Sequence, residues 1–411
     1  MWCIWLKEKN YFFFLYKKQK YLFLGKERKV FLIDNPLKGK FILSNYKSKK
    51  EGKDKFSRVA NITFDITDKC NMDCIYCYAY TKKKKKIMKF ETARLMIDFM
   101  QNNKDYDSLS ISFTGSGEPT LAFNLIKKIV NYAKKGKKPV KVYLANTNAS
   151  LLKKEDIKWL AKNNSGSITV SFEVLEDIQN FQRPFKGNKP SFKKVMETLK
   201  LFDKFNLEYG IRVTLTKKNY KKIIDCIKFI KENLKCRLIK IDPVSISGKA
   251  KKNPQLKVTM MQYAKEAQKA YEFAKKNGIH LVIVSMAQRR KNEFCKALEP
   301  NSFTINSSNS IISCPAYAFD DNPKSNPFLF GKIDLKNKKV IFDKNKIINL
   351  NKKRVESLKK CNKCSYNLFC FGGCPKIDYS HKTKKFIPPT KSYCSARKKL
   401  IRYMLVNNRI D

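Results

Sequence analysis

The chain has 411 residues, of which 43% are hydrophobic and 12% aromatic, so it can bury a large core and is not disordered as a whole. Its length favours two or three domains. No stretch approaches the roughly 18 to 20 uninterrupted apolar residues of a membrane helix. The N-terminus also lacks the features of a secretory signal. These observations predict a cytoplasmic protein without a membrane segment.

The chain is strongly basic, with 88 Lys and Arg against 35 Asp and Glu and a net charge of +53. Only 12 of the 88 are Arg, which nucleic-acid-binding proteins usually cluster on bases and phosphates. The lysines are spread over the whole length, and the run at 82–86 is one dense point among many. This pattern favours solvated lysine faces and argues against nucleic acid as a partner.

Cysteine is the informative residue, because there are 13 Cys but only two His. A cytosolic protein has little use for disulfides, and so few His argue against His-based zinc catalysis or a Ser-His-Asp triad. Ten of the cysteines fall into two spaced groups, which indicates metal clusters.

The first group, Cys70, Cys74 and Cys77, has the spacing C-x3-C-x2-C. Three thiolates from one loop can bind three irons of a [4Fe–4S] cube and leave the fourth iron for a small molecule. The preceding residues 62–67 alternate like a strand, so the loop is predicted at the carboxyl end of that strand. A zinc knuckle is the alternative, but it needs four ligands.

This motif resembles that of the radical S-adenosylmethionine (SAM) enzymes, in which an aromatic residue, here Tyr76, precedes the last cysteine. Strand-like runs follow at 109–113, 140–145, 168–172, 211–215 and 238–241, separated by helical patterns. One helical pattern runs from Phe192 to Phe202, with Ser191 as its expected N-cap. About six βα units are therefore predicted, and the resemblance implies an α/β fold with an open, partial (β/α)6 barrel over residues 59–285.

The resemblance also implies SAM contacts in the loops after these strands. Gly115–Pro119 is similar to the family's Gly-Gly-Glu-Pro motif, and 146–149 to its Thr-Asn-Gly. Glu118 would pair with the SAM ammonium, and Arg183 would bind the SAM carboxylate. Ser171 and Glu173 would reach the ribose. The turn at 248–250 would lie near the adenine. The family usually has Asp where this chain has Glu173. The full set of expected SAM contacts is Tyr76, Ser116, Gly117, Glu118, Asn148, Ser171, Glu173 and Arg183.

The second group resembles the seven-cysteine pattern of the SPASM domain, which carries auxiliary clusters in peptide-modifying radical SAM enzymes. It predicts such a domain over 286–411, although Asn309 stands where the pattern has Gly. By the family's cluster sharing, one [4Fe–4S] cluster would be bound by Cys361, Cys364, Cys370 and Cys394. A second, with an iron that no cysteine of the pattern binds, would be bound by Cys295, Cys314 and Cys374. A treble-clef-like zinc fold is the alternative.

Three cysteines lie outside both groups: Cys3, Cys226 and Cys236. The last two are expected to be small buried hydrophobic residues.

Residues 1–58 are predicted to form a β-rich segment, with strands near 11–15, 21–24, 30–33 and 41–43 and a Lys-rich linker at 47–55. Relatives place a leader-peptide recognition domain there, so this segment is either a peptide-binding element or a sheet that packs on the barrel.

The resemblance implies three [4Fe–4S] clusters, SAM as cofactor, and reduced ferredoxin or flavodoxin as electron donor. The expected activity is that of an oxidoreductase and peptide maturase. A 5′-deoxyadenosyl radical would take hydrogen from a ribosomal peptide or protein, which then forms a thioether or carbon–carbon crosslink or is oxidised. Three alternatives stay open: a sulfatase-type maturase that makes formylglycine, a radical SAM enzyme acting on a small molecule or tetrapyrrole, and a basic nucleic-acid binder with zinc sites and no enzymatic activity.

Overall fold

The computed structural model describes residues 58–79, 85–283, 297, 299–364, 366, 370, 372–380 and 382–406, together with the backbone of three strands between 11 and 33. The chain divides into two compact units. One contains residues 58–285 and 295–352, and the other contains 1–57, 286–294 and 353–411. We call them the barrel unit and the cysteine-rich unit.

The barrel unit contains the six parallel strands that the sequence predicts. They are β4 (Val59–Asp65), β5 (Ser108–Thr114), β6 (Val140–Leu144), β7 (Ile168–Ser171), β8 (Tyr209–Leu215) and β9 (Leu238–Pro243). Pairing is parallel within β4–β5–β6 and within β7–β8–β9, and a parallel bridge between Thr147 and Val170 joins the two sets. The strands therefore follow chain order around the sheet, and the predicted α/β fold is confirmed.

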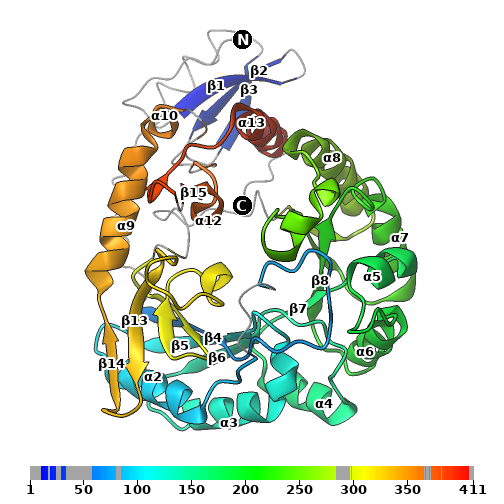
Figure 1. The fold of residues 1–411 in the computed structure, drawn as a ribbon. Helices are drawn as coiled ribbons and strands as arrows, with labels where there is room; N and C mark the ends of the chain where they lie inside the picture. Colours follow the sequence, from blue (N-terminus) through cyan, green and yellow to red (C-terminus); the bar gives the residue numbers. More distant parts are fainter. Residues whose placement is uncertain are drawn as a thin grey trace. The chain divides into compact units, whose positions relative to one another are not determined.

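Helices cover the outer face of this sheet (Figure 1). They are α2 (Phe90–Asn102), α3 (Phe123–Ala133), α4 (Lys154–Asn163), α5 (Glu176–Gln182), α6 (Phe192–Lys204), α7 (Ile223–Asn233) and α8 (Met260–Lys276). Alternate strand residues such as Ile62, Ile111 and Val213 are fully buried. The residues between them, such as Thr63, Ser112 and Arg212, are only partly buried and point to the other face, because side chains alternate along a strand. The apolar side of the sheet thus forms the core, and the inner side is polar.

Further strands extend this sheet at both edges, which the sequence analysis did not predict. β10 (His280–Ile283) pairs in parallel with β9, and β11 (Ser302–Asn306) pairs in parallel with β4. β12 (Ser310–Ile312), β13 (Leu329–Asp334) and β14 (Lys339–Phe342) then continue the sheet in antiparallel order. Residues 295–352 therefore group with the barrel unit, although the sequence places them beyond a boundary at 285. The domain boundaries themselves stay predictions.

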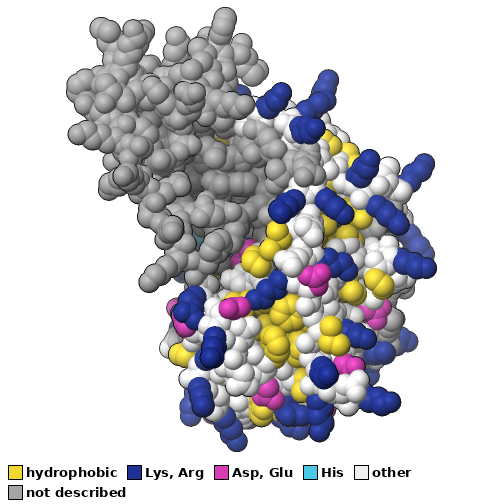
Figure 2. Space-filling model, turned by 90° about the vertical axis from the view of Figure 1, so that its left-hand side faces the viewer, with side chains coloured by type: hydrophobic (Ala, Val, Ile, Leu, Met, Phe, Trp, Pro, Cys, Tyr) yellow, Lys and Arg dark blue, Asp and Glu magenta, His cyan; other side chains and the backbone are white. Residues whose placement is uncertain are grey.

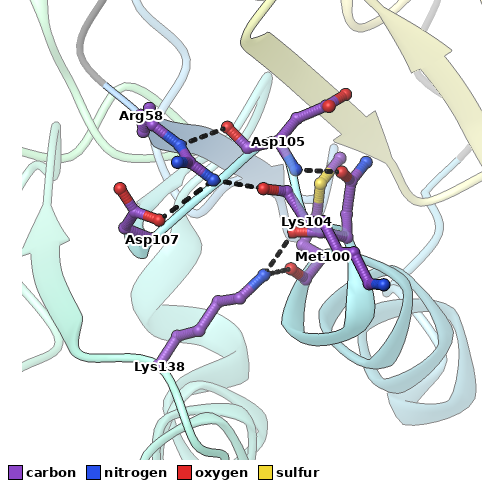
Figure 3. A network of polar contacts seen from close by, with 7 residues as sticks. Arg58, Met100, Lys104, Asp105, Asp107 and Lys138 are labelled. Carbon is purple, nitrogen blue, oxygen red and sulfur yellow. Dashed lines mark hydrogen bonds and ion pairs between the residues drawn. The ribbon is translucent and has the colours of Figure 1, made fainter.

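A charged network ties the amino-terminal ends of the barrel strands together (Figure 3). Arg58, just before β4, forms an ion pair with Asp107 at 3.2 Å and donates to the backbone oxygens of Lys104 and Asp105. Lys138, just before β6, donates to the Met100 oxygen at 2.8 Å. The ion-paired side chains are more than half exposed, so we expect a modest stabilising role for this end of the barrel.

Lysine and arginine side chains are scattered over the face drawn in Figure 2, with a few acidic side chains between them. On this face they do not gather into one stripe, which agrees with solvated lysine faces. Among the residues that the structure describes, no helix is long and apolar enough to cross a membrane.

The cysteine-rich unit contains the predicted N-terminal strands and the last helix. β1 (Tyr11–Tyr16), β2 (Gln19–Leu24) and β3 (Lys29–Ile33) form an antiparallel sheet, and β1 lies beside α13 (Lys391–Val406). Residues 41–43 and the linker at 47–55 lie outside the described part. The remaining elements are α9 (Lys344–Ser357), whose last residues belong to this unit, α10 (Lys359–Asn362), α12 (Pro375–Asp378), β15 (Tyr379–Ser380) and β16 (Lys385–Phe386).

Candidate active site

The first cysteine group lies in the loop directly after β4, at the carboxyl end of the sheet, as predicted. Cys70, Cys74 and Cys77 are all partly exposed. The loop backbone is bound to the segment that follows α5, because the Asp73 N–H donates to the Pro184 oxygen at 2.8 Å and the Ile75 N–H to the Gln182 oxygen at 3.1 Å. The three thiols therefore belong to a loop with a defined backbone.

The glycine-rich loop after β5 packs against this cysteine loop. The Gly117 N–H donates to the Thr67 oxygen at 3.0 Å, and the Glu118 N–H donates to the Lys69 oxygen at 2.7 Å. A Cβ on Gly117 would overlap the Lys69 carbonyl group. The resemblance implied that Gly117 contacts SAM, but the contact that requires a glycine at this position is with the protein's own cysteine loop.

Asp65 joins the same two loops, and the sequence analysis did not single it out. It is the last residue of β4 and is almost fully buried. Its carboxylate accepts from the Ser116 N–H at 2.6 Å and from the Ser116 hydroxyl at 2.5 Å. The predicted SAM contact Ser116 is thus bound to β4. The sequence did carry a signal for its role, because Asp65 is the only charged residue of β4 and stands at the end of the strand.

Glu118 connects the second and third loops. Its Oε1 accepts from the Thr120 hydroxyl and the Thr147 hydroxyl, both at 2.6 Å, and its Oε2 accepts from the Asn148 N–H at 2.7 Å. Burial raises the pKa of this carboxyl, and the hydrogen bonds from Thr120 and Thr147 partly offset that rise. A carboxylate has about four acceptor positions, so Oε2 keeps one for a further donor.

Asn148 connects the third loop to the cysteine loop. Its side-chain amide donates to Asn71 Oδ1 at 2.9 Å, and its Oδ1 accepts from the Ser150 hydroxyl at 2.8 Å. The next residue, Ala149, has a φ of +61°, a left-handed conformation that glycine adopts more easily. This backbone conformation explains why the family has glycine at this position. Ala149 adopts the same conformation at a cost in backbone energy.

The fourth loop brings together Tyr76, Glu173 and Arg183. The Tyr76 hydroxyl donates to Glu173 Oε1, and it accepts from Arg183 Nη1 at 3.0 Å. Glu173 Oε2 accepts from the Thr214 N–H at 2.9 Å. Burial raises the pKa of Glu173 to about 7, although the Arg183 charge and the Tyr76 hydrogen bond lower it.

Ser171 and Ser191 lie near this group. Ser171 is partly exposed at the end of β7, and its N–H donates to the Thr147 oxygen at 2.9 Å. Ser191 was expected to cap α6, and that prediction is wrong for its side chain. The hydroxyl instead donates to the Arg183 oxygen at 2.7 Å and accepts from the Gln179 amide at 2.8 Å, because it is buried between α5 and α6.

The turn after β9 also packs on the cysteine loop. Gly248 has a φ of +56°, and a Cβ there would overlap the backbone oxygens of Cys77 and Tyr78. The Lys249 N–H donates to the Cys77 oxygen at 2.9 Å, and the Lys249 ammonium forms an ion pair with Asp73 at 2.8 Å. The turn at 248–250 therefore lies beside the last cysteine of the loop.

The residues of this site fit a bound SAM and an iron–sulfur cluster. Arg183 Nε and Gln182 Nε2 are buried and have no hydrogen-bond partner among the described residues, which suits a polar ligand. Beside them lies a loop with three thiols, the donor type that iron–sulfur clusters use. Within the described ranges, no three His, Cys, Asp or Glu side chains converge as they would around a single metal ion.

In the cysteine-rich unit, four predicted ligands line one cavity. A small cavity of about 30 Å³ is lined by Cys361, Cys364, Cys370 and Cys394, together with Tyr366, Gly372, Pro389 and Lys398. Burial and, to a lesser extent, the neighbouring thiols Cys394, Cys370 and Cys364 together raise the pKa of Cys361 to about 11. Four thiols that repel each other as thiolates are a suitable donor set for a cationic iron–sulfur core.

A tight glycine turn lies beside these cysteines. Gly372 and Gly373 have φ values of +72° and +92°, and they directly precede Cys374. Asn309, which replaces a glycine of the pattern, has a φ of +66°, so it adopts the left-handed conformation that Asn tolerates better than most residues.

The other predicted auxiliary set includes residues of both units and one residue outside the described part. Cys295 lies outside the described residues, and Cys3 does too. Cys314 follows β12 in the barrel unit, where it is buried, and Cys374 belongs to the cysteine-rich unit. The cluster of Cys295, Cys314 and Cys374 therefore stays a prediction.

Cys226 and Cys236 are buried, as expected for small hydrophobic residues. Burial raises the pKa of the Cys236 thiol to about 11 and raises that of Cys226 still higher. Both thiols therefore stay protonated at neutral pH, which makes them poor metal ligands.

Comparison with known proteins identifies the class of this molecule. The radical SAM superfamily matches residues 64–230, from β4 to α7. The α/β architecture and the three-cysteine loop after its first barrel strand agree with that match. The chain therefore belongs to the radical SAM superfamily and is an enzyme.

Similarity to three known proteins extends over most of the length of each. An uncharacterized protein of Methanocaldococcus jannaschii is 31% identical over 259 residues, which are 62% of this chain and 84% of that protein. A cysteine-type anaerobic sulfatase-maturating enzyme of Clostridium perfringens is 23% identical over 365 residues, 81% of this chain and 93% of that one. The solved structure of native anSMEcpe with bound AdoMet and Kp18Cys peptide has a TM-score of 0.67 at 21% identity, covering 85% of this chain and 99% of that one, which shows a shared fold.

Proposed function

We propose that this enzyme is a radical SAM maturase that modifies a side chain of a ribosomally made peptide or protein. The observation that carries the proposal is the three-thiol loop beside the buried Arg183, whose Nε has no hydrogen-bond partner among the described residues. A thiol-bound [4Fe–4S] cluster and SAM together supply a carbon radical that removes hydrogen from unactivated carbon.

The proposed SAM contacts lie in the loops around the cysteine loop. Arg183 would bind the SAM carboxylate through its available Nε–H, and the remaining acceptor position on Glu118 Oε2 suits the ammonium. Tyr76, Ser116, Gly117, Asn148, Ser171 and Glu173 complete the proposed set. Ser116, Asn148 and Glu173 are almost fully buried and hydrogen-bonded within the protein, so their role would be to maintain the loops' geometry as much as to touch the ligand.

A peptide or protein substrate is supported by the relatives, since one is a cysteine-type sulfatase-maturating enzyme and the solved neighbour contains a Cys peptide. Two product classes follow. The modified side chain forms a thioether or carbon–carbon crosslink, or it is oxidised. Formylglycine is the second candidate, favoured by the long match to the cysteine-type enzyme.

The C-terminal cysteines would bind two auxiliary [4Fe–4S] clusters that take up the surplus electron, one at Cys361, Cys364, Cys370 and Cys394 and one at Cys295, Cys314 and Cys374. The cavity that the first four cysteines line supports the first of these. Reduced ferredoxin or flavodoxin would be the electron donor. Residues 1–58 would be the element that binds a leader peptide.

The test is an anaerobic assay of the reconstituted enzyme with SAM, a reductant and a short Cys-containing peptide. We expect formation of 5′-deoxyadenosine and a peptide whose mass has changed. Loss of the sulfur with gain of a carbonyl oxygen identifies formylglycine, whereas loss of two hydrogens with the sulfur retained identifies a crosslink. SAM cleavage without any peptide product, with peptides co-expressed from neighbouring reading frames as well, would contradict a peptide substrate.

Lys398 is expected to set the reduction potential of the cluster in the cysteine-rich unit. It lies one helical turn after Cys394 on α13 and lines the same cavity. Burial raises the pKa of the Cys394 thiol, and the Lys398 charge partly offsets that rise. Replacing it with Met removes a positive charge beside an anionic cluster, so the added electron becomes less favourable. We expect a midpoint potential more negative by roughly tens of millivolts, the scale of one partly screened unit charge.

A redox titration followed by electron paramagnetic resonance, in a background where Cys70, Cys74 and Cys77 are Ala, measures this potential. Lys399→Met is the matched control, because Lys399 is the neighbouring lysine on the exposed side of α13. Equal shifts in the two variants would mean that Lys398 has no specific effect. Zinc in place of iron would exclude the auxiliary cluster itself.

A further inference from the structure

The Tyr76 hydroxyl stands between two charged groups from the fourth loop. It donates to Glu173 Oε1 and accepts from Arg183 Nη1 at 3.0 Å. Tyr76 lies between Cys74 and Cys77 in the sequence, so these bonds attach the centre of the cysteine loop to residues more than ninety positions away. The contact therefore joins the segment that carries both of these cysteines to the barrel.

Glu173 is attached firmly to the barrel. It is fully buried, and its Oε2 accepts from the Thr214 N–H of β8 at 2.9 Å. Its own N–H donates to the buried Gln179 side chain at 2.9 Å. The next residue, Val174, is buried with a φ of +70°, which is rare for a β-branched residue and typically costs about 1 to 3 kcal/mol. The chain therefore keeps Glu173 in this position at a cost in backbone energy.

The length of the side chain matters for this arrangement. The carboxylate spans from the β8 backbone to the Tyr76 phenol, with one oxygen on each. An Asp at 173, one methylene shorter, would lose one of these two contacts. This offers a physical reason for Glu where the family usually has Asp.

Arg183 is oriented by the same phenol. Its backbone oxygen accepts from the Ser191 hydroxyl at 2.7 Å, and its Nη1 donates to Tyr76. Its Nε has no hydrogen-bond partner among the described residues. The Tyr76 contact thus fixes the guanidinium while Nε stays available for a ligand.

We propose that Glu173 is a positioning residue that fixes Tyr76, and through it the cysteine loop and the Arg183 guanidinium, rather than a direct contact to the ribose of SAM. This inference depends on the proposed function, because it concerns the geometry of the cluster loop and of the SAM carboxylate site. It differs from the role that the family resemblance implies for Glu173.

Two substitutions separate these roles. Glu173→Gln leaves one acceptor oxygen, so either the Tyr76 O–H or the Thr214 N–H loses its acceptor. Tyr76→Phe removes only the hydroxyl. As positioning residues, both should weaken SAM binding by about tenfold, and the double variant should be no worse than either single one, because all three remove the same connection.

The discriminating probes are SAM and its 2′-deoxy analogue, each measured by equilibrium binding to reconstituted enzyme. If Glu173 positions Tyr76, all variants should keep the normal preference for SAM over the analogue. In both single variants, the reduced cluster at Cys70, Cys74 and Cys77 should also show a changed electron paramagnetic resonance signal in the absence of SAM. The signal of this cluster is obtained by subtracting the spectrum of the variant in which all three cysteines are Ala. If Glu173 instead binds the ribose, Glu173→Gln should erase the preference for SAM over the 2′-deoxy analogue. Tyr76→Phe should then leave SAM binding and the cluster signal unchanged. Either result overturns the proposal.

Tyr76→Phe keeps the test decisive if Glu173→Gln does not fold, because the two roles predict opposite results for it. A wild-type protein that binds neither iron nor SAM would instead contradict the proposed function. Failure of the positioning role and failure of the function are therefore distinguishable.

Discussion

Replacing Cys70, Cys74 and Cys77 together with Ala is expected to abolish reductive cleavage of SAM. The three thiols occupy one loop after β4, and a [4Fe–4S] cluster at that site depends on these thiolates for three of its irons. If all three proposed clusters form, the iron content should fall from about twelve to about eight per chain. Anaerobic iron counting and assay of 5′-deoxyadenosine measure both effects.

Two other cysteines of the barrel unit are the matched control for this experiment. Cys226 and Cys236 are buried, and burial keeps both thiols protonated at neutral pH. Cys226→Ala and Cys236→Ala should retain the full iron content and SAM cleavage, at a modest cost in stability. Loss of a cluster in either control, or retained SAM cleavage in the triple variant, would contradict the assignment of the first cysteine group.

The barrel strands could be predicted because local patterns decide them. Residues 62–67 and 211–215 alternate apolar and polar side chains, as a half-buried strand does, and β4 and β8 form there. Each predicted loop therefore follows the expected strand, and Tyr76, Glu118, Asn148 and Arg183 come from separate loops that hydrogen bonds connect.

The contacts among these residues could not be predicted, because they depend on tertiary distances. In the sequence, Asp65 is only the last residue of a strand. Its role becomes apparent from its two hydrogen bonds with Ser116 in the folded protein. Ser191 reads as a helix cap, yet its buried hydroxyl has a better partner in the Arg183 backbone. Glu173 reads as a ligand contact, whereas both of its oxygens accept hydrogen bonds from protein groups.

The edge strands were missed for a different reason. β11 (Ser302–Asn306) is only five residues long, and it pairs with β4 more than two hundred residues earlier in the chain. Because cysteines of the auxiliary-cluster pattern flank this strand on both sides, the whole region was assigned to the auxiliary-cluster domain. Cysteine spacing indicates ligands, but it carries no information about which sheet the intervening residues join.

Gly117→Ala is expected to disrupt the cysteine loop while changing a single atom. The added Cβ would overlap the Lys69 carbonyl group, which is backbone and cannot rotate away as a side chain would. The overlap must displace the backbone directly before Cys70 or break the bonds from the Gly117 and Glu118 N–H groups to Thr67 and Lys69. We expect a loss of about 1 to 3 kcal/mol in the free energy of unfolding, as for overpacked sites.

Function should suffer more than stability in this variant, because the displaced residues lead directly into the first cysteine. We expect iron loss confined to the site of Cys70, Cys74 and Cys77, and SAM binding weakened in proportion. Gly166→Ala is the matched control, since a Cβ there meets only the Tyr143 ring, at 3.1 Å, and the residue has no positive φ. Thermal unfolding and iron counting of both variants test the prediction, and a Gly117→Ala protein with normal iron and SAM binding would show that the glycine loop does not set the position of the cysteine loop.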